Sequence, residues 1–235
     1  TISSGYDSSA VAVIAKYAGC KQAVTISNST SMWRGSDSGE KISAKLGLCC
    51  TAYKHDTNLY KNEEAIWAAI GRPRGLNMTI FDYPEPLCLF FTGNYGDKIW
   101  DPSYPQPQFA ELTGDLSGLC ICEFRLIKGM FHCMPTWWGV RHSRDIREIS
   151  ISGEMEPWTL HTNYDRPIAR RIIEQSGVPR GTFATRKKNT SSERPFLWPY
   201  SSESQARFRD YLKNQGFYAP KPFLVRMICW AAHLE

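Results

Sequence analysis

Small polar residues, one glycine and one acid stand together near the start of the chain, at Ser3 to Ser9 (SSGYDSS). Between a strand and a helix, such a loop presents backbone N–H groups at the positive end of the helix dipole, which favours anions. Gly5 lets the backbone approach a ligand closely, and the carboxylate of Asp7 is an oxygen ligand suited to Mg²⁺. The stretch predicts a phosphate-binding loop; the alternative is an ordinary helix start capped by serine.

Two further stretches carry side chains suited to phosphate chemistry. The glycine-rich turn 92–97 (TGNYGD) follows the apolar run Pro86 to Phe91, which predicts a central strand. The stretch 186–195 (RKKNTSSERP) is basic and polar. Because residues 186–193 offer no apolar anchor, we expect a mobile loop that orders over a bound phosphate ligand. Its lysines either face phosphate or belong to a solvated charge run.

The elements that must position these stretches alternate along the chain. Residues 8–17 (SSAVAVIAKY) are apolar nearly all round, as in a helix pressed on a sheet, and Gly19 ends the pattern. Asp37 and Glu40 have the spacing of a capping box. The expected order is helix 8–17, strand 23–26, helix 37–47, strand 49–53, helix 62–70 and strand 86–91. This order predicts a parallel sheet covered on both faces, with ligands at the carboxyl ends of its strands.

The second half of the chain is expected to be mostly helical. The predicted helices are 119–130, 167–176, 202–214 and 222–234, and an aromatic, irregular segment is expected at 131–138. We divide the chain at about residue 112. The expected parts are a core at 1–112 and a helical half at 113–235 that packs on the same domain and covers the site.

The composition is that of a globular protein with a modest affinity for anions. The 235 residues are 42% hydrophobic and 22% charged, with a formal net charge of +5, which is too small to indicate nucleic acid. Eight cysteines without any CxxC spacing predict reduced, mostly buried thiols in a cytoplasmic protein. The sequence shows no signal peptide and no apolar run of the roughly 20 residues that cross a bilayer.

The loop Ser3 to Ser9 resembles the SGGxDSS loop of the ATP pyrophosphatases, in particular the asparagine synthetase-like group. The turn Thr92 to Asp97 resembles the second motif of that family, SGxGxDE. Residues 37–47 resemble the helix between the two motifs (D, then A, then LG), and 186–188 resemble its late R-x-K. The resemblance covers roughly the first hundred residues well and the helical half only loosely.

This resemblance implies a fold and a set of ligands. The fold is α/β, a parallel five-stranded sheet with helices on both faces, followed by a mostly helical half. The ligands are ATP and Mg²⁺: Asp7 and Asp97 hold the cation, and Lys188, or Lys187 beside it, faces the phosphates. The remaining nucleotide-binding residues are Ser3, Ser4, Gly5, Ser8, Ser9, Ile26 and Gly93.

The resemblance also implies a reaction. An oxygen of a small-molecule acceptor is adenylated, pyrophosphate leaves, and a nitrogen nucleophile then displaces AMP. A glutaminase domain would supply ammonia, either in trans or in sequence that we expect to precede Thr1. Nucleic acid and membrane are not expected as partners.

Among the positions that depart from the family pattern, Ser4, Asn94 and Lys98 bear on the ligand and the chemistry. Ser4 stands where the family has a glycine, Asn94 where asparagine synthetases carry a glutamate, and Lys98 where the second motif ends in glutamate. An amide cannot act as a general base at neutral pH. One alternative is therefore a non-catalytic nucleotide-binding or sensor domain. Another is a thiolase or amidotransferase that modifies tRNA or a sugar, and the absence of CxxC argues against tRNA thiolation.

The other candidate residues have plainer interpretations. His132-Cys133 is expected to be a packed pair in a core. Arg170-Arg171 is expected on a solvated helix face, with anion binding through Arg166 or Arg180 as the alternative. The aromatic side chains either fill a core or line a substrate pocket: Trp137, Trp138, Trp158 and Tyr164.

Overall fold

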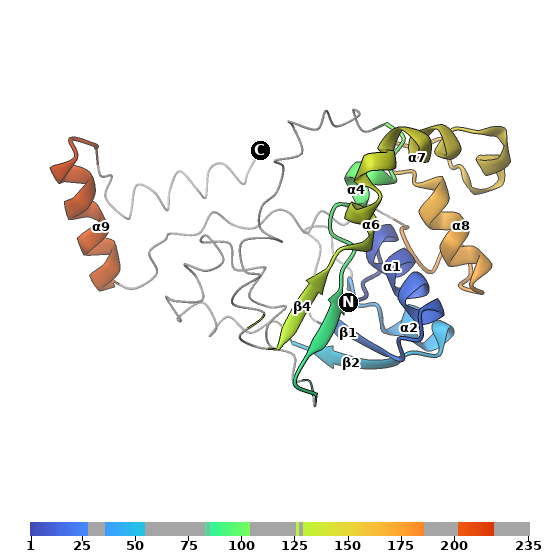
Figure 1. Cartoon of the computed structure of the whole chain (residues 1–235), viewed down its shortest axis with the longest axis horizontal. Helices are drawn as coiled ribbons and strands as arrows, with labels where there is room; N and C mark the ends of the chain where they lie inside the picture. Colours follow the sequence, from blue (N-terminus) through green and yellow to red (C-terminus); the bar gives the residue numbers. More distant parts are fainter. Residues whose placement is uncertain are drawn as a thin grey trace. The chain divides into compact units, whose positions relative to one another are not determined.

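The computed structural model describes residues 1–27, 36–54, 83, 85–103, 126, 129–185 and 202–218 (Figure 1). The predicted helices 62–70 and 222–234, most of the predicted helix 119–130, and the stretch 186–195 with Lys187 and Lys188 lie outside these residues. The chain divides into two compact units. The first unit comprises residues 1–55, 83–115 and 129–189, and the second comprises residues 56–82, 116–128 and 190–235. The predicted division at residue 112 stays a prediction.

The first pair of strands follows the predicted pattern. Strand β1 (Gln22–Ile26) and strand β2 (Cys49–Tyr53) are parallel, with Gln22 opposite Cys49 and Ile26 opposite Tyr53. Helix α2 (Glu40–Leu46) connects them and ends at Gly47, whose φ of 68° is a conformation that glycine adopts without steric cost. The predicted strands at 23–26 and 49–53 are confirmed, and so is the end of the predicted helix.

The second pair of strands corrects two predictions. Strand β3 (Cys88–Phe91) starts two residues later than expected, and it runs parallel to strand β4 (Met130–Cys133). The predicted helix 119–130 does not reach its expected end, because Gly129 has a φ of +72° and Met130 begins β4. The segment 131–138 is not irregular either. It contains the end of β4 and helix α6 (Pro135–Trp138), which begins at a proline.

In the described residues the strands form two parallel two-stranded sheets, within a mixed α/β arrangement, and no five-stranded sheet is seen. The first two residues of the chain bond to both pairs. The N–H group of Ile2 donates to the carbonyl of Val24 in β1 at 2.9 Å, and the amino group of Thr1 donates to the carbonyl of Phe91 in β3. Residues 1 and 2 therefore lie between β1 and β3.

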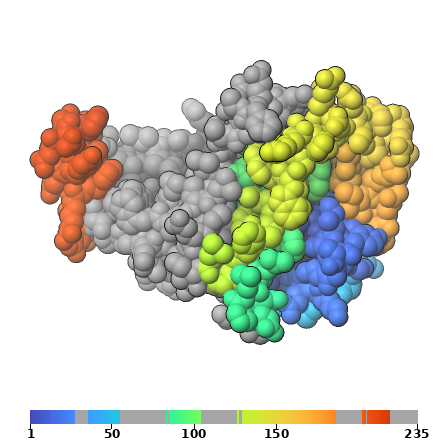
Figure 2. Space-filling model, in the orientation of Figure 1, coloured from blue at the N-terminus to red at the C-terminus, as the bar shows by residue number. Residues whose placement is uncertain are grey.

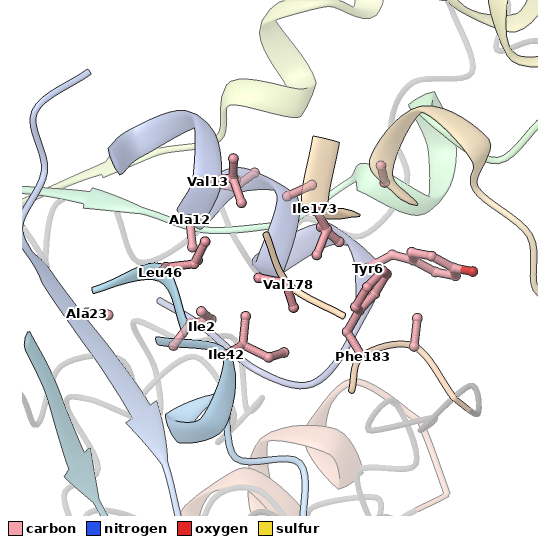
Figure 3. Close-up of a cluster of buried hydrophobic side chains, with 14 of the residues drawn as sticks. Ile2, Tyr6, Ala12, Val13, Ala23, Ile42, Leu46, Ile173, Val178 and Phe183 are labelled. Carbon is pink, nitrogen blue, oxygen red and sulfur yellow. The ribbon is translucent and has the colours of Figure 1, made fainter. Parts of the chain in front are cut away.

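Helix α1 (Tyr6–Tyr17) forms the centre of the hydrophobic core. Its residues Ala10, Val11 and Val13 are fully buried, as its nearly continuous apolar pattern predicts. It packs against helix α8 (Pro167–Gln175), and Figure 2 shows the orange part of the chain, which includes α8, against the blue part that includes α1. Figure 3 shows the surrounding side chains, among them Ile2, Ile42, Leu46, Ile173, Val178 and Phe183.

The remaining elements are short, apart from α7 and α9. They are α4 (Gly96–Ile99), the 3₁₀ helix η5 (Val140–His142), α7 (Ser143–Ser150), the 3₁₀ helix η6 (Gly153–Trp158) and α9 (Ser202–Asn214). The predicted helices 167–176 and 202–214 are confirmed by α8 and α9. Among the described cysteines, the five at 20, 49, 50, 88 and 133 are free thiols. In the same part of the chain, no helix has both the length and the apolar character that crossing a bilayer requires.

We expect the contact between α1 and α8 to be a main source of stability for the first unit. Replacing Ile173, which is 0% exposed, with alanine leaves a cavity in this contact and should lower the free energy of unfolding by about 2–4 kcal/mol. Ile151→Ala is the matched control, because Ile151 is 62% exposed, and it should cost less than about 0.5 kcal/mol. Chemical denaturation of both variants tests this, and equal losses would contradict the assignment of the core.

Candidate anion-binding site

The loop before α1 is held in shape by its own serines. The N–H group of Ser3 donates to Oγ of Ser8 at 3.0 Å, and the two hydroxyl oxygens lie 2.7 Å apart. Oγ of Ser9 donates to the carbonyl of Ser3 at 2.9 Å. Gly5 is the N-cap residue of α1 and has no side chain with which to cap the helix. The first-turn N–H groups of α1 therefore receive no cap from the N-cap position, although the hydroxyl of Tyr164 accepts a hydrogen bond from the backbone of Tyr6.

Ser4 ties the loop to two distant segments. Its hydroxyl donates to Oδ1 of Asp37 at 2.6 Å, and its carbonyl accepts the N–H group of Ala184 at 2.7 Å. The predicted capping box at Asp37 is therefore wrong. Helix α2 is capped by Gly39, which lies so close to Ile2 that an added Cβ would come within 2.6 Å of Cγ2 of Ile2. The serine that departs from the family pattern has a structural partner here.

The glycine-rich turn 92–97 lies directly against the first turn of α1. A Cβ added to Gly93 would be 2.3 Å from the backbone nitrogen of Ser8, and one added to Gly96 would be 2.4 Å from Cγ of Asp7. Real Cβ atoms do not approach this closely, so both positions require glycine. The structure brings together the two glycine turns that the sequence places at the ends of separate strands.

Asp7 forms a partly buried ion pair with Arg166, the residue just before α8. Nη1 of Arg166 donates to Oδ2 of Asp7, and the two side chains are 3% and 23% exposed respectively. Within the described structure, Oδ1 of Asp7 and Nε of Arg166 are buried without a hydrogen-bond partner. Burial raises the pKa of Asp7 to about 6; the charge of Arg166 opposes this rise, and those of Asp97 and Asp101 add to it.

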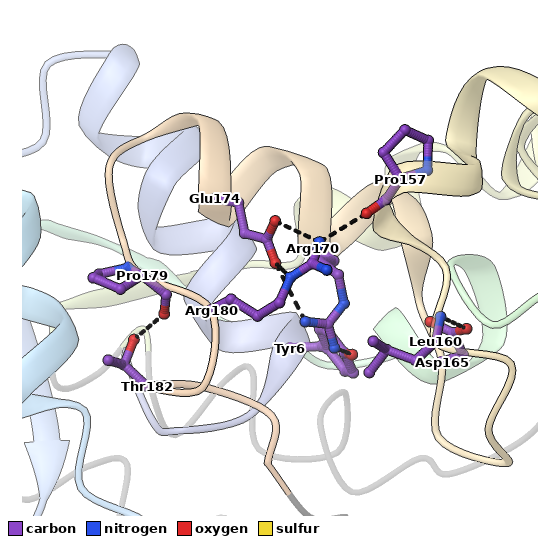
Figure 4. Close-up of polar contacts among 9 residues, drawn as sticks. All are labelled: Tyr6, Pro157, Leu160, Asp165, Arg170, Glu174, Pro179, Arg180 and Thr182. Atoms are coloured by element: carbon purple, nitrogen blue, oxygen red, sulfur yellow. Dashed lines mark hydrogen bonds and ion pairs between the residues drawn. The ribbon is translucent and has the colours of Figure 1, made fainter.

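Arg170 is buried, so its prediction as a solvated residue is wrong. It donates to the hydroxyl of Tyr6 and to Oε1 of Glu174, and its guanidinium lies 5.1 Å from the centre of the Tyr6 ring (Figure 4). Arg180 also donates to Glu174, at 2.7 Å. Although burial raises the pKa of Glu174, the bonds from the two arginines outweigh it and lower that pKa. Arg170 and Arg180 therefore both form ion pairs with Glu174.

The other predicted binding residues lie at the ends of their elements. Asp97 is exposed in the first turn of α4, and its charge reaches Asp7, whose pKa it raises. Ile26 is half-buried at the carboxyl end of β1. Oγ1 of Thr136 donates to the backbone carbonyl of Asn94 at 2.5 Å, and Nζ of Lys98 lies 5.3 Å from the centre of the Tyr95 ring.

The histidine and aromatic candidates are dispersed. Cys133 is buried, whereas His132 is half-buried, with Nε2 2.6 Å from Oγ1 of Thr92. Trp137 packs on Tyr95 with ring centres 4.5 Å apart, while Trp138 is mostly exposed. Two more aromatic residues contact arginines: Tyr164 beside Arg166 and Trp158 beside Arg171. In the part of the chain described, these aromatic side chains form separate contacts rather than one cluster.

The residues at the start of α1 fit a phosphate ligand with a cation. No group of three or more metal-binding side chains occurs among the described residues, so an all-protein metal cage is not found there. Mg²⁺ usually takes one or two carboxylates and completes its shell with water and phosphate oxygens. The buried Oδ1 of Asp7, which lacks a partner in the described structure, suits a cation in this combination.

Comparison of the chain with protein-family models, curated proteins and solved structures found no match. Two contacts within the site are not predicted by the sequence. The sequence offers Arg166 only as an alternative anion-binding residue, without a link to Asp7, and Asp37 bonds to Ser4 instead of capping a helix. A signal for Arg166 exists in hindsight, because a basic residue directly before Pro167 stands at the entry to a predicted helix.

The close contact at Gly93 leads to a test. Gly93→Ala places a methyl group 2.3 Å from the backbone of α1, so the turn or the helix must move, and the free energy of unfolding should fall by about 1–3 kcal/mol. Gly153→Ala is the matched control, because an added Cβ there meets nothing within 4 Å. We would measure urea denaturation of both, and a Gly93→Ala variant as stable as the control would refute the contact.

The raised pKa of Asp7 predicts a pH dependence. The folded protein binds this proton with a pKa of about 6, against the ordinary value of 3.8 in the unfolded chain, so Asp7 lowers the stability as pH rises from about 4 to about 6. The free energy of unfolding of the wild type, minus that of Asp7→Asn, should fall by roughly 1–3 kcal/mol across this range. If this difference in the free energy of unfolding stays constant or rises between pH 4 and 6, the raised pKa of Asp7 is contradicted.

Proposed function

We propose that this chain is an ATP-binding domain that adenylates an oxygen of a small-molecule acceptor and releases pyrophosphate. This is the activity of the asparagine synthetase-like ATP pyrophosphatases that its motifs resemble. The observation that carries the proposal is the contact of Gly93 and Gly96 with the first turn of α1. It joins the two motifs at Asp7, beside N–H groups suited to an anion.

The finer fold is part of this proposal. We propose one five-stranded parallel sheet in the order β2, β1, residues 1–2, β3 and β4. Its support is that both known pairs are parallel, and that Ile2 bonds to Val24 while Thr1 bonds to Phe91. In such a sheet, Ser3–Ser9 follows the central strand and Thr92–Asp97 follows its neighbour. Both loops then meet at the carboxyl edge, where α/β sheets bind their ligands.

The proposed reaction assigns a role to each loop. N–H groups at the start of α1 would bind the pyrophosphate part of ATP, and Asp7 with Asp97 would hold Mg²⁺, which neutralises charge on the leaving pyrophosphate. The acceptor oxygen attacks the α-phosphorus, the bond from this phosphorus to the bridging oxygen of pyrophosphate breaks, and AMP is attached to the acceptor. A nitrogen nucleophile, supplied by a glutaminase partner or by free ammonia, then displaces AMP. The roles of Lys187, Lys188 and of Ile26 toward adenine stay predictions.

A second candidate is a nucleotide-binding module without chemistry. It is favoured by Asn94 and Lys98, which replace acids of the family's second motif. The ammonium of Lys98 lies over the ring of Tyr95, so that position contributes a cation where the family has a carboxylate. Such a module would bind Mg·ATP and leave it intact.

One experiment separates these candidates. Calorimetry with ATP, with and without Mg²⁺, measures binding, and pyrophosphate release is then assayed across a panel of small carboxylic acids with ammonium as the nitrogen donor. The proposed enzyme binds Mg·ATP and releases pyrophosphate with at least one acid. Binding without release across the panel favours the module, and no binding at millimolar Mg·ATP contradicts both.

The proposed cation site predicts the effect of a single carboxylate. Asp97→Asn replaces a charged oxygen ligand with a neutral amide, so pyrophosphate release should fall by about 100-fold or more. Stability should change by less than about 0.5 kcal/mol, because Asp97 is exposed. Asp145→Asn, an equivalent change on the exposed face of α7, serves as the control. Equal turnover in the two variants would reduce Asp97 to a turn residue.

A further inference from the structure

Arg166 is an unusual residue to find at this position. Its side chain is 3% exposed, yet it stands at the first turn of α1, where Nη1 donates to Oδ2 of Asp7. Its guanidinium also lies over the ring of Tyr164, 5.3 Å from the ring centre. A buried cation is therefore held beside the N–H groups of a helix that already favours anions.

The bonding of Arg166 is incomplete. A guanidinium has five N–H donors, and in the described part of the chain Nε has no acceptor although it is buried. Oδ1 of Asp7 is likewise buried without a partner. Burial of an unpaired donor is costly, and an anion with several oxygens, such as a phosphate, can satisfy it together with the helix N–H groups.

We propose that Arg166 is a phosphate-binding residue of this site, held by Asp7 in the absence of ligand and transferred to the phosphate when one binds. The inference rests on the proposed function, since it names the residue that receives the pyrophosphate group. Asp7 is a competitor for the guanidinium in the free protein. When phosphate takes the guanidinium, Asp7 is released, and its carboxylate can then bind the cation that accompanies the phosphate.

The competition gives the two members of the ion pair opposite effects on anion binding. Removing Arg166 removes a ligand, so binding weakens. Removing the charge of Asp7 frees Arg166, so binding without a metal strengthens. An ion pair that only supports the fold gives a different result, because loss of either member would then disturb the loop and weaken binding.

The test uses inorganic pyrophosphate in the presence of EDTA, so that no divalent cation contributes. Calorimetry should show pyrophosphate binding about 10- to 100-fold weaker in Arg166→Gln, with partial rescue in Arg166→Lys. Asp7→Asn should bind about 10-fold more tightly than the wild type. Asp101→Asn is the control for simple loss of negative charge, because Asp101 influences Asp7 electrostatically but bonds to Ser103, and it should gain no more than about 3-fold.

A double-mutant cycle isolates the transfer of the guanidinium. In the Arg166→Gln background, Asp7→Asn should give no more gain than Asp101→Asn gives in the wild type, because there is no arginine left to free. The double variant also removes both buried charges, so it serves if Arg166→Gln alone fails to fold, as far-UV circular dichroism would reveal. In that case the pyrophosphate affinities of Arg166→Lys and of the double variant are measured instead, and each is compared with the affinity of Asp7→Asn.

The possible results separate the role of Arg166, the transfer of its guanidinium and the proposed function. Pyrophosphate binding that is equal in wild type, Arg166→Gln and Arg166→Lys overturns the role of Arg166 and leaves the proposed function standing. Weaker binding in Asp7→Asn overturns the transfer, as does a full gain from Asp7→Asn in the Arg166→Gln background. If neither pyrophosphate in EDTA nor Mg·ATP binds to the wild type, the phosphate site and the proposed function fail together.

Discussion

The burial of the middle of α1, residues 9–13, is the constraint on which the rest of the described structure depends. Five consecutive buried residues span more than one helical turn, so other elements must cover this part of α1 on every side, whereas Ile14, Lys16 and Tyr17 are exposed. Its first turn and the loop before it contact three separate segments, which contribute Asp37, Gly93 and Arg166. Polar groups enclosed in this way must find partners, and this need explains the dense hydrogen bonding among the serines of the loop.

Elements with strong local signals were predictable from the sequence. Helices α1 and α8 have clear apolar patterns and end near Gly19 and Gly177, both of which have positive φ. The four-residue strand β4 lacked such a signal. Its residues take strand form because they pair with β3, a contact between parts of the chain that lie far apart in sequence. No local pattern in so short a segment reports that pairing.

The candidate site likewise combines residues that the sequence predicts with contacts that it does not predict. The order of small and acidic residues in the two loops predicts Asp7, Gly5 and Gly93 as site residues, and their role as ligands stays a prediction. The ion pair of Asp7 with Arg166 and the burial of Arg170 are not predicted, because the pattern of α8 cannot show which of its faces another helix covers. Arginine on a helix is usually solvated, and here α1 supplies both the cover and, through Tyr6, a hydrogen-bond acceptor. Tertiary contacts therefore determine how these charges are used.

The ion pair between Asp7 and Arg166 joins residues separated by 159 positions in sequence. A ribosome that adds 5–20 residues per second needs roughly 8–32 s to make that length of chain. During synthesis, the first turn of α1 is therefore made well before Arg166, its buried cation. Ala184, which bonds to Ser4, is translated later still. The loop can close only after most of the first unit has been translated, which makes its closure a late event in biogenesis.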